Sequence, residues 1–118
     1  MTIHWIPLTS EAEIEQLKER SDKIPCLIFK HSTRCNISSV ARYRLESDWN
    51  FDTTQMEAYF LDLLNYRTVS GRIADVFQVY HESPQVLLII NGECIYDASH
   101  LSISVDELNE ALDSVASK

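Results

Sequence analysis

The chain has 118 residues, enough for one domain with a single modest core and too few for two. Its apolar share of 45% and charged share of 24% are those of an ordinary globular protein. A formal net charge of -8 repels nucleic-acid phosphates and anionic lipids, so we expect neither nucleic acid nor a membrane surface as a partner.

Predicted strands and helices alternate through the first half of the chain. Residues 3–8 form a short strand, and the capping-box spacing within Ser10–Glu13 begins a helix over about residues 11–21. The apolar run 25–30, which opens with a proline, is typical of a strand that is covered on both faces. From Asn36 onward, apolar residues recur every three to four positions, which predicts a second helix.

The middle of the chain is less regular. Residues 49–54 show no period, and we expect a loop there. The composition of residues 57–63 favours a strand, whereas residues 65–79 carry apolar side chains on one helical face. Residues 81–85, which include Ser83-Pro84, break the pattern and separate this helix from the next element.

The C-terminal part has the clearest signals. Residues 86–90 form a strand, Asn91-Gly92 is the preferred two-residue type I′ hairpin turn, and residues 94–96 return. A second capping box at Ser104–Glu107 begins a last helix that runs through Val115.

The resulting order is β-α-β-α-β-α-β-β-α, which is an α/β fold. Alternating strands and helices predict parallel pairings with right-handed crossovers, and the hairpin adds an antiparallel edge. We therefore expect a mixed central sheet with helices on both faces, in one domain over residues 1–118. No segment has the pattern of an export signal or a membrane span, so we expect a cytoplasmic protein whose thiols stay mostly reduced.

The chain has three cysteines, and an odd number argues against a disulfide framework. Their spacing gathers no four-ligand zinc site, and we expect no bound metal or cofactor. Cys26 lies within an apolar run and is expected to pack in the core. Cys94 follows the hairpin turn, and the sequence assigns it no role.

Cys35 stands where chemistry concentrates in such a fold. It follows the carboxyl end of a buried strand and directly precedes a helix, whose unpaired N–H groups and partial positive charge favour thiolate over thiol. Arg34 acts in the same direction, as do Lys30 and His31 nearby. The polar, basic flanks disfavour the alternative that Cys35 is only a small apolar residue at a turn. We therefore predict that Cys35 is a reactive thiol.

Ser38 and Ser83-Pro84 complete the predicted site. Ser38 occupies the position of the second cysteine in a C-x-x-C pair, so its hydroxyl or backbone N–H is expected within reach of the Cys35 sulfur. A cis proline beside a reactive cysteine exposes the preceding backbone to an incoming substrate, and X-Pro bonds are where cis peptides occur. We expect His31 at the surface, and an approach of His81 to the proline is the less favoured alternative.

Residues 29–38 read F-K-H-S-T-R-C-N-I-S, which resembles the F-K-H-S-T-x-C-P-I-S motif of the YtxJ-type bacilliredoxins. Ser83-Pro84-Gln85 and Asn91-Gly92 are similar to that family too, and the element order resembles the thioredoxin superfamily over nearly the whole chain. The resemblance implies a thioredoxin-like fold and a monothiol thiol–disulfide oxidoreductase of the bacterial bacillithiol system. It also implies bacillithiol, or a similar low-molecular-weight thiol, as co-substrate and thiol-capped client proteins as partners.

Carried over by position, the resemblance makes Cys35 the attacking thiolate, Ser38 the replaced resolving cysteine and Pro84 a cis proline. The expected substrate contacts flank the sulfur and the proline: Thr33, Arg34, Asn36, Ser83 and Pro84.

Two positions depart from the pattern of the resembled proteins. Asn36 stands where the family usually has proline, so the first helical turn is less rigid. Phe29 stands at the place of the buried acid of classical thioredoxins, so a dithiol cycle is not expected. Two other functions stay open from the sequence: a protein-binding module in which Cys35 is incidental, and a monothiol carrier that ligates an iron–sulfur cluster together with a low-molecular-weight thiol.

Overall fold

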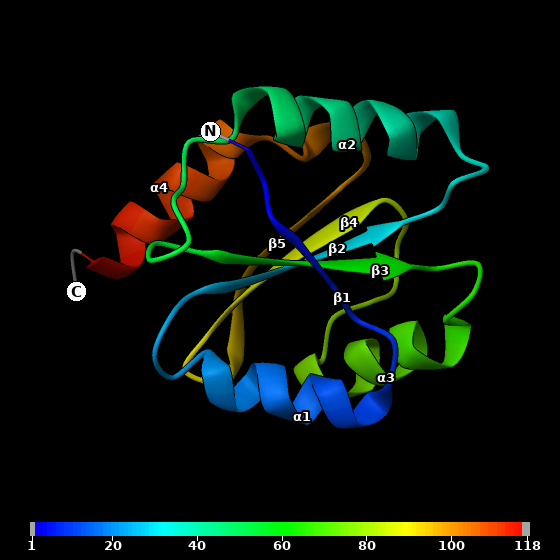
Figure 1. Cartoon of the computed structure of the whole chain (residues 1–118), viewed down its shortest axis with the longest axis horizontal. Helices are drawn as coiled ribbons and strands as arrows, with labels where there is room; N and C mark the ends of the chain where they lie inside the picture. Colours follow the sequence, from blue (N-terminus) through cyan, green and yellow to red (C-terminus); the bar gives the residue numbers. More distant parts are fainter. Residues whose placement is uncertain (1, 117–118) are drawn as a thin grey trace.

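A five-stranded mixed sheet forms the centre of the computed structural model, which describes residues 2–116 (Figure 1). The helices and strands follow in this order: β1 (Trp5–Pro7), α1 (Glu11–Arg20), β2 (Cys26–His31), α2 (Asn36–Asp48), β3 (Glu57–Asp62), α3 (Arg67–Phe77), β4 (Gln85–Ile90), β5 (Glu93–Ser99), the short 3-10 helix η1 (His100–Ser102) and α4 (Val105–Ala116). Within this part of the chain, the helices fall short of the length and apolar character that a membrane span requires.

The strands lie in the order β1-β3-β2-β4-β5, so β2 is the central strand. It pairs in parallel with β3 and antiparallel with β4, and its Lys30 lies opposite Gln85. The hairpin β4–β5 is antiparallel, as predicted, and its turn residues Asn91 and Gly92 have φ values of 53° and 78°. Positive φ at both positions is what a type I′ turn requires.

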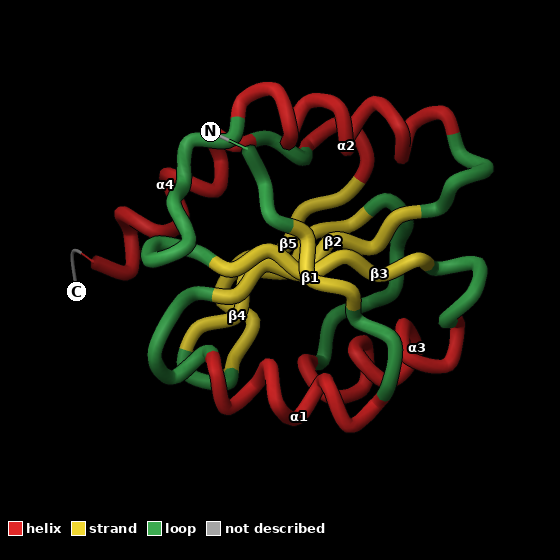
Figure 2. Tube along the Cα trace, in the orientation of Figure 1, coloured by secondary structure: helices red, strands yellow, loops and turns green. Residues whose placement is uncertain are grey.

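The sheet lies between two helical layers, with α1 and α3 on one face and α2 and α4 on the other (Figures 1 and 2). Each layer encloses its own core, because successive residues of β2 point to opposite faces. Leu27 and Phe29 pack with residues of α2 and α4. Cys26 and Ile28 pack with residues of α1 and α3. The sequence prediction of a mixed sheet covered on both faces is therefore confirmed.

Both predicted capping boxes begin their helices as expected. The Ser10 hydroxyl accepts the Glu13 N–H at 3.3 Å at the start of α1. The Ser104 hydroxyl likewise accepts the Glu107 N–H at 3.2 Å at the start of α4. Each bond satisfies one of the N–H groups that a helix start leaves unpaired, which fixes where these two helices begin.

The direction of β4 differs from the prediction of parallel pairing after a helical crossover. Gln78 ends α3 in the left-handed conformation, with φ 56°, and residues 78–84 then carry the chain back to the edge where β2 ends (Figure 1). The next strand consequently starts at that edge and runs antiparallel to β2. The bounds of two elements also differ slightly from the prediction: α3 is shorter than predicted, and β5 is longer.

The two glycines offer a matched test of backbone conformation. Gly92→Ala is expected to lower the free energy of unfolding by about 1 kcal/mol, because alanine is strained at φ +78° although the nearest Lys18 atom, at 3.5 Å, leaves ordinary contact space. Gly71→Ala, in α3 with nothing within 4 Å of the added Cβ, should raise it by about 0.5–1 kcal/mol. Urea titration of both variants measures these changes, and the opposite order would contradict the turn assignment.

Candidate active site

Cys35 caps the amino end of α2, just beyond the turn that follows β2. Its backbone is extended, with φ -107° and ψ 120°, its N–H donates to the Ser32 carbonyl at 3.1 Å, and its carbonyl accepts the Ser39 N–H at 3.1 Å. The side chain is half-buried, and the first turn of α2 contains no acidic residue. A helix start of this kind stabilises negative charge placed on it. The predicted position of Cys35 between strand and helix is therefore confirmed.

Ser38 is fully buried in the first turn of α2, and its hydroxyl contacts β2 and the turn rather than the sulfur. Ser38 Oγ accepts the Ser32 N–H at 3.0 Å and lies 2.6 Å from His31 Nδ1. Within residues 2–116, no hydrogen bond joins the Ser38 hydroxyl to Cys35 Sγ. The Ser38 side chain thus fixes the turn that carries Cys35, and its equivalence to a resolving cysteine stays a prediction.

Three of the expected substrate contacts surround Cys35 in the turn and the first helical position. Thr33, Arg34 and Asn36 are all exposed. The other arginines of this region already have partners: Arg42 pairs with Glu46 at 3.4 Å, and Arg44 donates to the Leu101 carbonyl at 3.1 Å. The exposed side chains beside the sulfur are available to a substrate, and their role in binding stays a prediction.

Ser83 and Pro84 lie at the same edge of the sheet as the end of β2. The antiparallel register places Gln85 opposite Lys30, so Pro84 comes level with His31. The Ser83–Pro84 peptide bond is cis, as predicted. Pro84 is buried, and the Ser83 hydroxyl is buried without a hydrogen-bond partner among the described residues. The structure thus brings the proline and the Cys35 turn to one edge.

Lys30 and His31 are buried, which corrects the expectation that His31 lies at the surface and adds positive charge near the sulfur. Lys30 is 0% exposed and His31 is 3% exposed. Burial, and then the charge of Arg42, lower the pKa of His31 below its usual value of about 6.5, so the imidazole is neutral near pH 7. The reason for their burial is the central place of β2, which is covered on both faces up to its last residue.

His81 lies three residues before the cis proline, and an approach of its side chain to the proline stays a prediction. It contacts Lys30 rather than the sulfur, because its Nδ1 lies 3.2 Å from Lys30 Nζ. Burial, followed by the charge of Lys30, lowers the pKa of His81. No sequence pattern indicated this contact, since the two residues belong to separate elements.

The other two cysteines lack the features of Cys35. Cys26 is 0% exposed, as predicted for a core residue, and burial raises the pKa of its thiol to about 12. Cys94 packs against the core beneath α1 and α3, its thiol donates to the Tyr96 carbonyl at 3.3 Å, and burial raises its pKa to about 11. Both therefore stay protonated near neutral pH.

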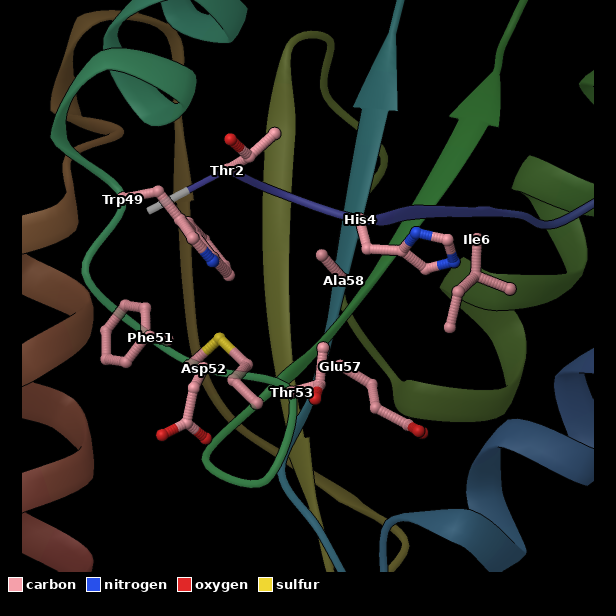
Figure 3. A pocket seen from close by; sticks show the side chains of 10 residues that line it. Thr2, His4, Ile6, Trp49, Phe51, Asp52, Thr53, Glu57 and Ala58 are labelled. Carbon is pink, nitrogen blue, oxygen red and sulfur yellow. The ribbon is translucent and has the colours of Figure 1, made fainter.

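A pocket of about 560 Å³ lies away from Cys35, between the N-terminal segment and the loop that follows α2 (Figure 3). Trp49, Phe51 and Met56 form its apolar part, and His4 and Asp52 lie among its polar residues. None of the predicted site residues lines it. The geometry of the sulfur, the helix start and the proline therefore defines the candidate active site, and this pocket is separate from it.

Comparison with known proteins gives a specific family. The family described as Monothiol bacilliredoxin BrxC matches residues 6–108. A solved structure assigned as an oxidoreductase with a thioredoxin fold is 31% identical, with a TM-score of 0.77, over 92% of this chain and 93% of its own. The family match therefore includes all the predicted site residues.

More distant structures agree in fold. The thioredoxin of Trypanosoma brucei brucei superposes with a TM-score of 0.76 at 9% identity, over 100% of this chain and 96% of its own. A mutant thioredoxin from Halobacterium salinarum gives 0.71 at 14% identity, over 94% of this chain and 89% of its own. At such identities the likeness shows the thioredoxin fold alone, as the sequence predicted.

Ser38→Ala tests the hydrogen bonds that hold the Cys35 turn. The change leaves the Ser32 N–H and His31 Nδ1 without their buried partner, so the free energy of unfolding should fall by about 1–3 kcal/mol. Ser39→Ala is the control, because Ser39 is exposed in the same helix and should change stability by less than about 0.5 kcal/mol. Equal midpoints for the two variants in urea would contradict the assigned bonds.

Limited alkylation tests the ranking of the three thiols. With iodoacetamide at about pH 8, Cys35 should be labelled first, because the pKa values of about 12 for Cys26 and about 11 for Cys94 leave little thiolate there. Peptide mass spectrometry follows each site over time. In urea-unfolded protein all three should react at similar rates, and native labelling of Cys94 as fast as Cys35 would disprove the ranking.

Proposed function

Because the chain belongs to the monothiol bacilliredoxin family of thiol–disulfide oxidoreductases, we propose that it removes bacillithiol from mixed disulfides on other proteins through Cys35. The position of Cys35 carries this proposal. Among the three cysteines it is the one at a helix start, with exposed polar neighbours and a half-buried side chain. The other two are held as thiols by burial.

The proposed reaction is one thiol–disulfide exchange. The Cys35 thiolate attacks the bacillithiol sulfur of the client's mixed disulfide. The disulfide bond between client and bacillithiol breaks, the client cysteine leaves as a thiolate, and a disulfide between Cys35 and bacillithiol forms. A second molecule of the low-molecular-weight thiol, or a reductase, then attacks that disulfide and restores Cys35. No second cysteine of this chain takes part.

The helix start and the surrounding side chains have separate proposed roles. The N–H groups at the start of α2 stabilise the attacking thiolate. Thr33, Arg34 and Asn36, exposed beside the sulfur, contact the low-molecular-weight thiol. On the opposite side of the site, Ser83 and Pro84 contact the client backbone.

A transfer experiment tests the proposal directly. A test protein with one bacillithiolated cysteine is incubated with the wild type, and intact mass spectrometry follows both chains. Cys35 should gain the bacillithiol that the test protein loses. Cys35→Ala should give no transfer, whereas Cys94→Ser, the matched loss of a thiol that burial keeps protonated, should transfer like the wild type.

An unmodified Cys35 and a test protein that stays capped would reject the proposal. If Cys35→Ala and the wild type also capture the same test protein equally, the site acts as a binding module in which the thiol is incidental.

A further inference from the structure

Lys30 is a buried cation near the carboxyl end of the central strand. Its side chain is 0% exposed, and no salt bridge within residues 2–116 includes it. A buried charge of this kind is costly unless hydrogen-bond acceptors surround it. Lys30 Nζ has two such contacts, the Ser70 carbonyl at 3.4 Å and His81 Nδ1 at 3.2 Å. The lysine side chain thus reaches from β2 to α3 and to the segment that follows it.

His81 belongs to the segment of residues 78–84, which joins α3 to β4 and is called the proline segment below because it ends at Pro84. His81 Nδ1 also lies 3.2 Å from the hydroxyl of Ser70, which is 1% exposed. One imidazole nitrogen therefore meets both a strand and a helix of the rigid core. Lys30 and Ser70 therefore contact the proline segment through the side chain of His81.

Other contacts hold the proline segment on either side of His81. The Gln85 side-chain amide donates to the Tyr80 carbonyl at 2.9 Å, and the Pro84 carbonyl accepts the His100 N–H at 3.0 Å. Gln85 in turn lies opposite Lys30 in the sheet. Lys30 therefore contacts two neighbouring parts of the chain: its backbone pairs with Gln85 in β4, and its ammonium group lies beside His81 in the proline segment.

The chemistry of the pair defines its charge. An ammonium group only donates, so His81 Nδ1 must accept and the imidazole is neutral, with its proton on Nε2. Burial lowers the pKa of Lys30 to about 8. The pKa of His81 is also lowered, mainly by burial and further by the charge of Lys30, whereas the charge of Glu82 raises it. Near neutral pH the pair therefore carries one positive charge, on Lys30. A proton added to His81 Nδ1 would remove the hydrogen-bond acceptor and place two positive charges side by side.

We propose that Lys30 is a positioning residue for protein substrates: by holding His81, it fixes the proline segment that presents Ser83 and Pro84 beside the Cys35 turn. This inference rests on the proposed function and deepens it. A protein client needs both the sulfur and the ordered backbone across the site, whereas a small disulfide needs only the sulfur. Loss of the Lys30–His81 contact should therefore weaken exchange with proteins and spare exchange with small molecules.

Three variants isolate this contact. Lys30→Met keeps an apolar stem of similar size and has no charge to desolvate, so we expect it to fold. His81→Leu removes the acceptor, and His81→Asn keeps an oxygen acceptor near the place of Nδ1 as the conservative control. Each is assayed with the bacillithiolated test protein, for kcat and KM, and with 2,2′-dithiodipyridine in a Cys94→Ser background, for the rate at which Cys35 releases pyridinethione.

Lys30→Met and His81→Leu should raise the KM for the test protein by about tenfold or more, the scale of one charge-assisted hydrogen bond. Their rate with the small disulfide should stay within about twofold of the parent, since a twofold change is well below the effect of such a bond. His81→Asn should keep a KM close to the parent's. An unchanged KM in the first two variants, or a parallel loss with both substrates, would overturn the proposal.

Two physical readouts keep this result apart from a failure of the proposed function. Nuclear magnetic resonance titration should show a higher His81 pKa in Lys30→Met, because the lysine charge that adds to its lowering is gone. Amide hydrogen exchange over residues 78–84 should also become faster. If the wild type leaves the test protein capped, the proposed function fails, and unchanged exchange over these residues would reject the positioning role separately.

Discussion

The burial of β2 along its whole length is the constraint on which the site depends. The strand lies between β3 and β4 and is covered by a helical layer on each face, so all six of its residues are buried. Its last two residues, Lys30 and His31, are nevertheless polar. Buried polar groups require hydrogen-bond partners, and only the segments that pack over the end of the strand can provide them.

Neighbouring residues of a strand point to opposite faces, so Lys30 and His31 find their partners in opposite layers. His31 meets the Ser38 hydroxyl at the start of α2, and Lys30 meets His81 beyond the end of α3. His31 therefore connects the central strand to the Cys35 turn, and Lys30 connects it to the proline segment. Two adjacent polar residues of β2 thus contact both segments that lie at the site.

Most of the local structure was predictable because its causes lie within a few residues. The capping boxes, the Asn-Gly turn and the strand-to-helix junction at Cys35 are set by neighbours in sequence, and each occurs where predicted. The antiparallel direction of β4 was not predictable, since it depends on the path of residues 78–84 through space. The burial of Lys30 could have been predicted, because a strand that is covered on both faces has its final residues buried too, but a lysine is ordinarily expected at the surface.

The residues around Cys35 are consistent with a cycle that uses one thiol. The sequence resemblance gives this chain no acid at the position of the buried acid of classical thioredoxins. Here Phe29 occupies that place, fully buried and stacked on Trp5 with ring centroids 5.6 Å apart. Ser38, which the resemblance places at the resolving position, has its hydroxyl bonded to the turn and to His31. The apolar ring and the bonded hydroxyl make these positions structural, which supports the proposed cycle in which Cys35 alone exchanges and a thiol outside the chain regenerates it.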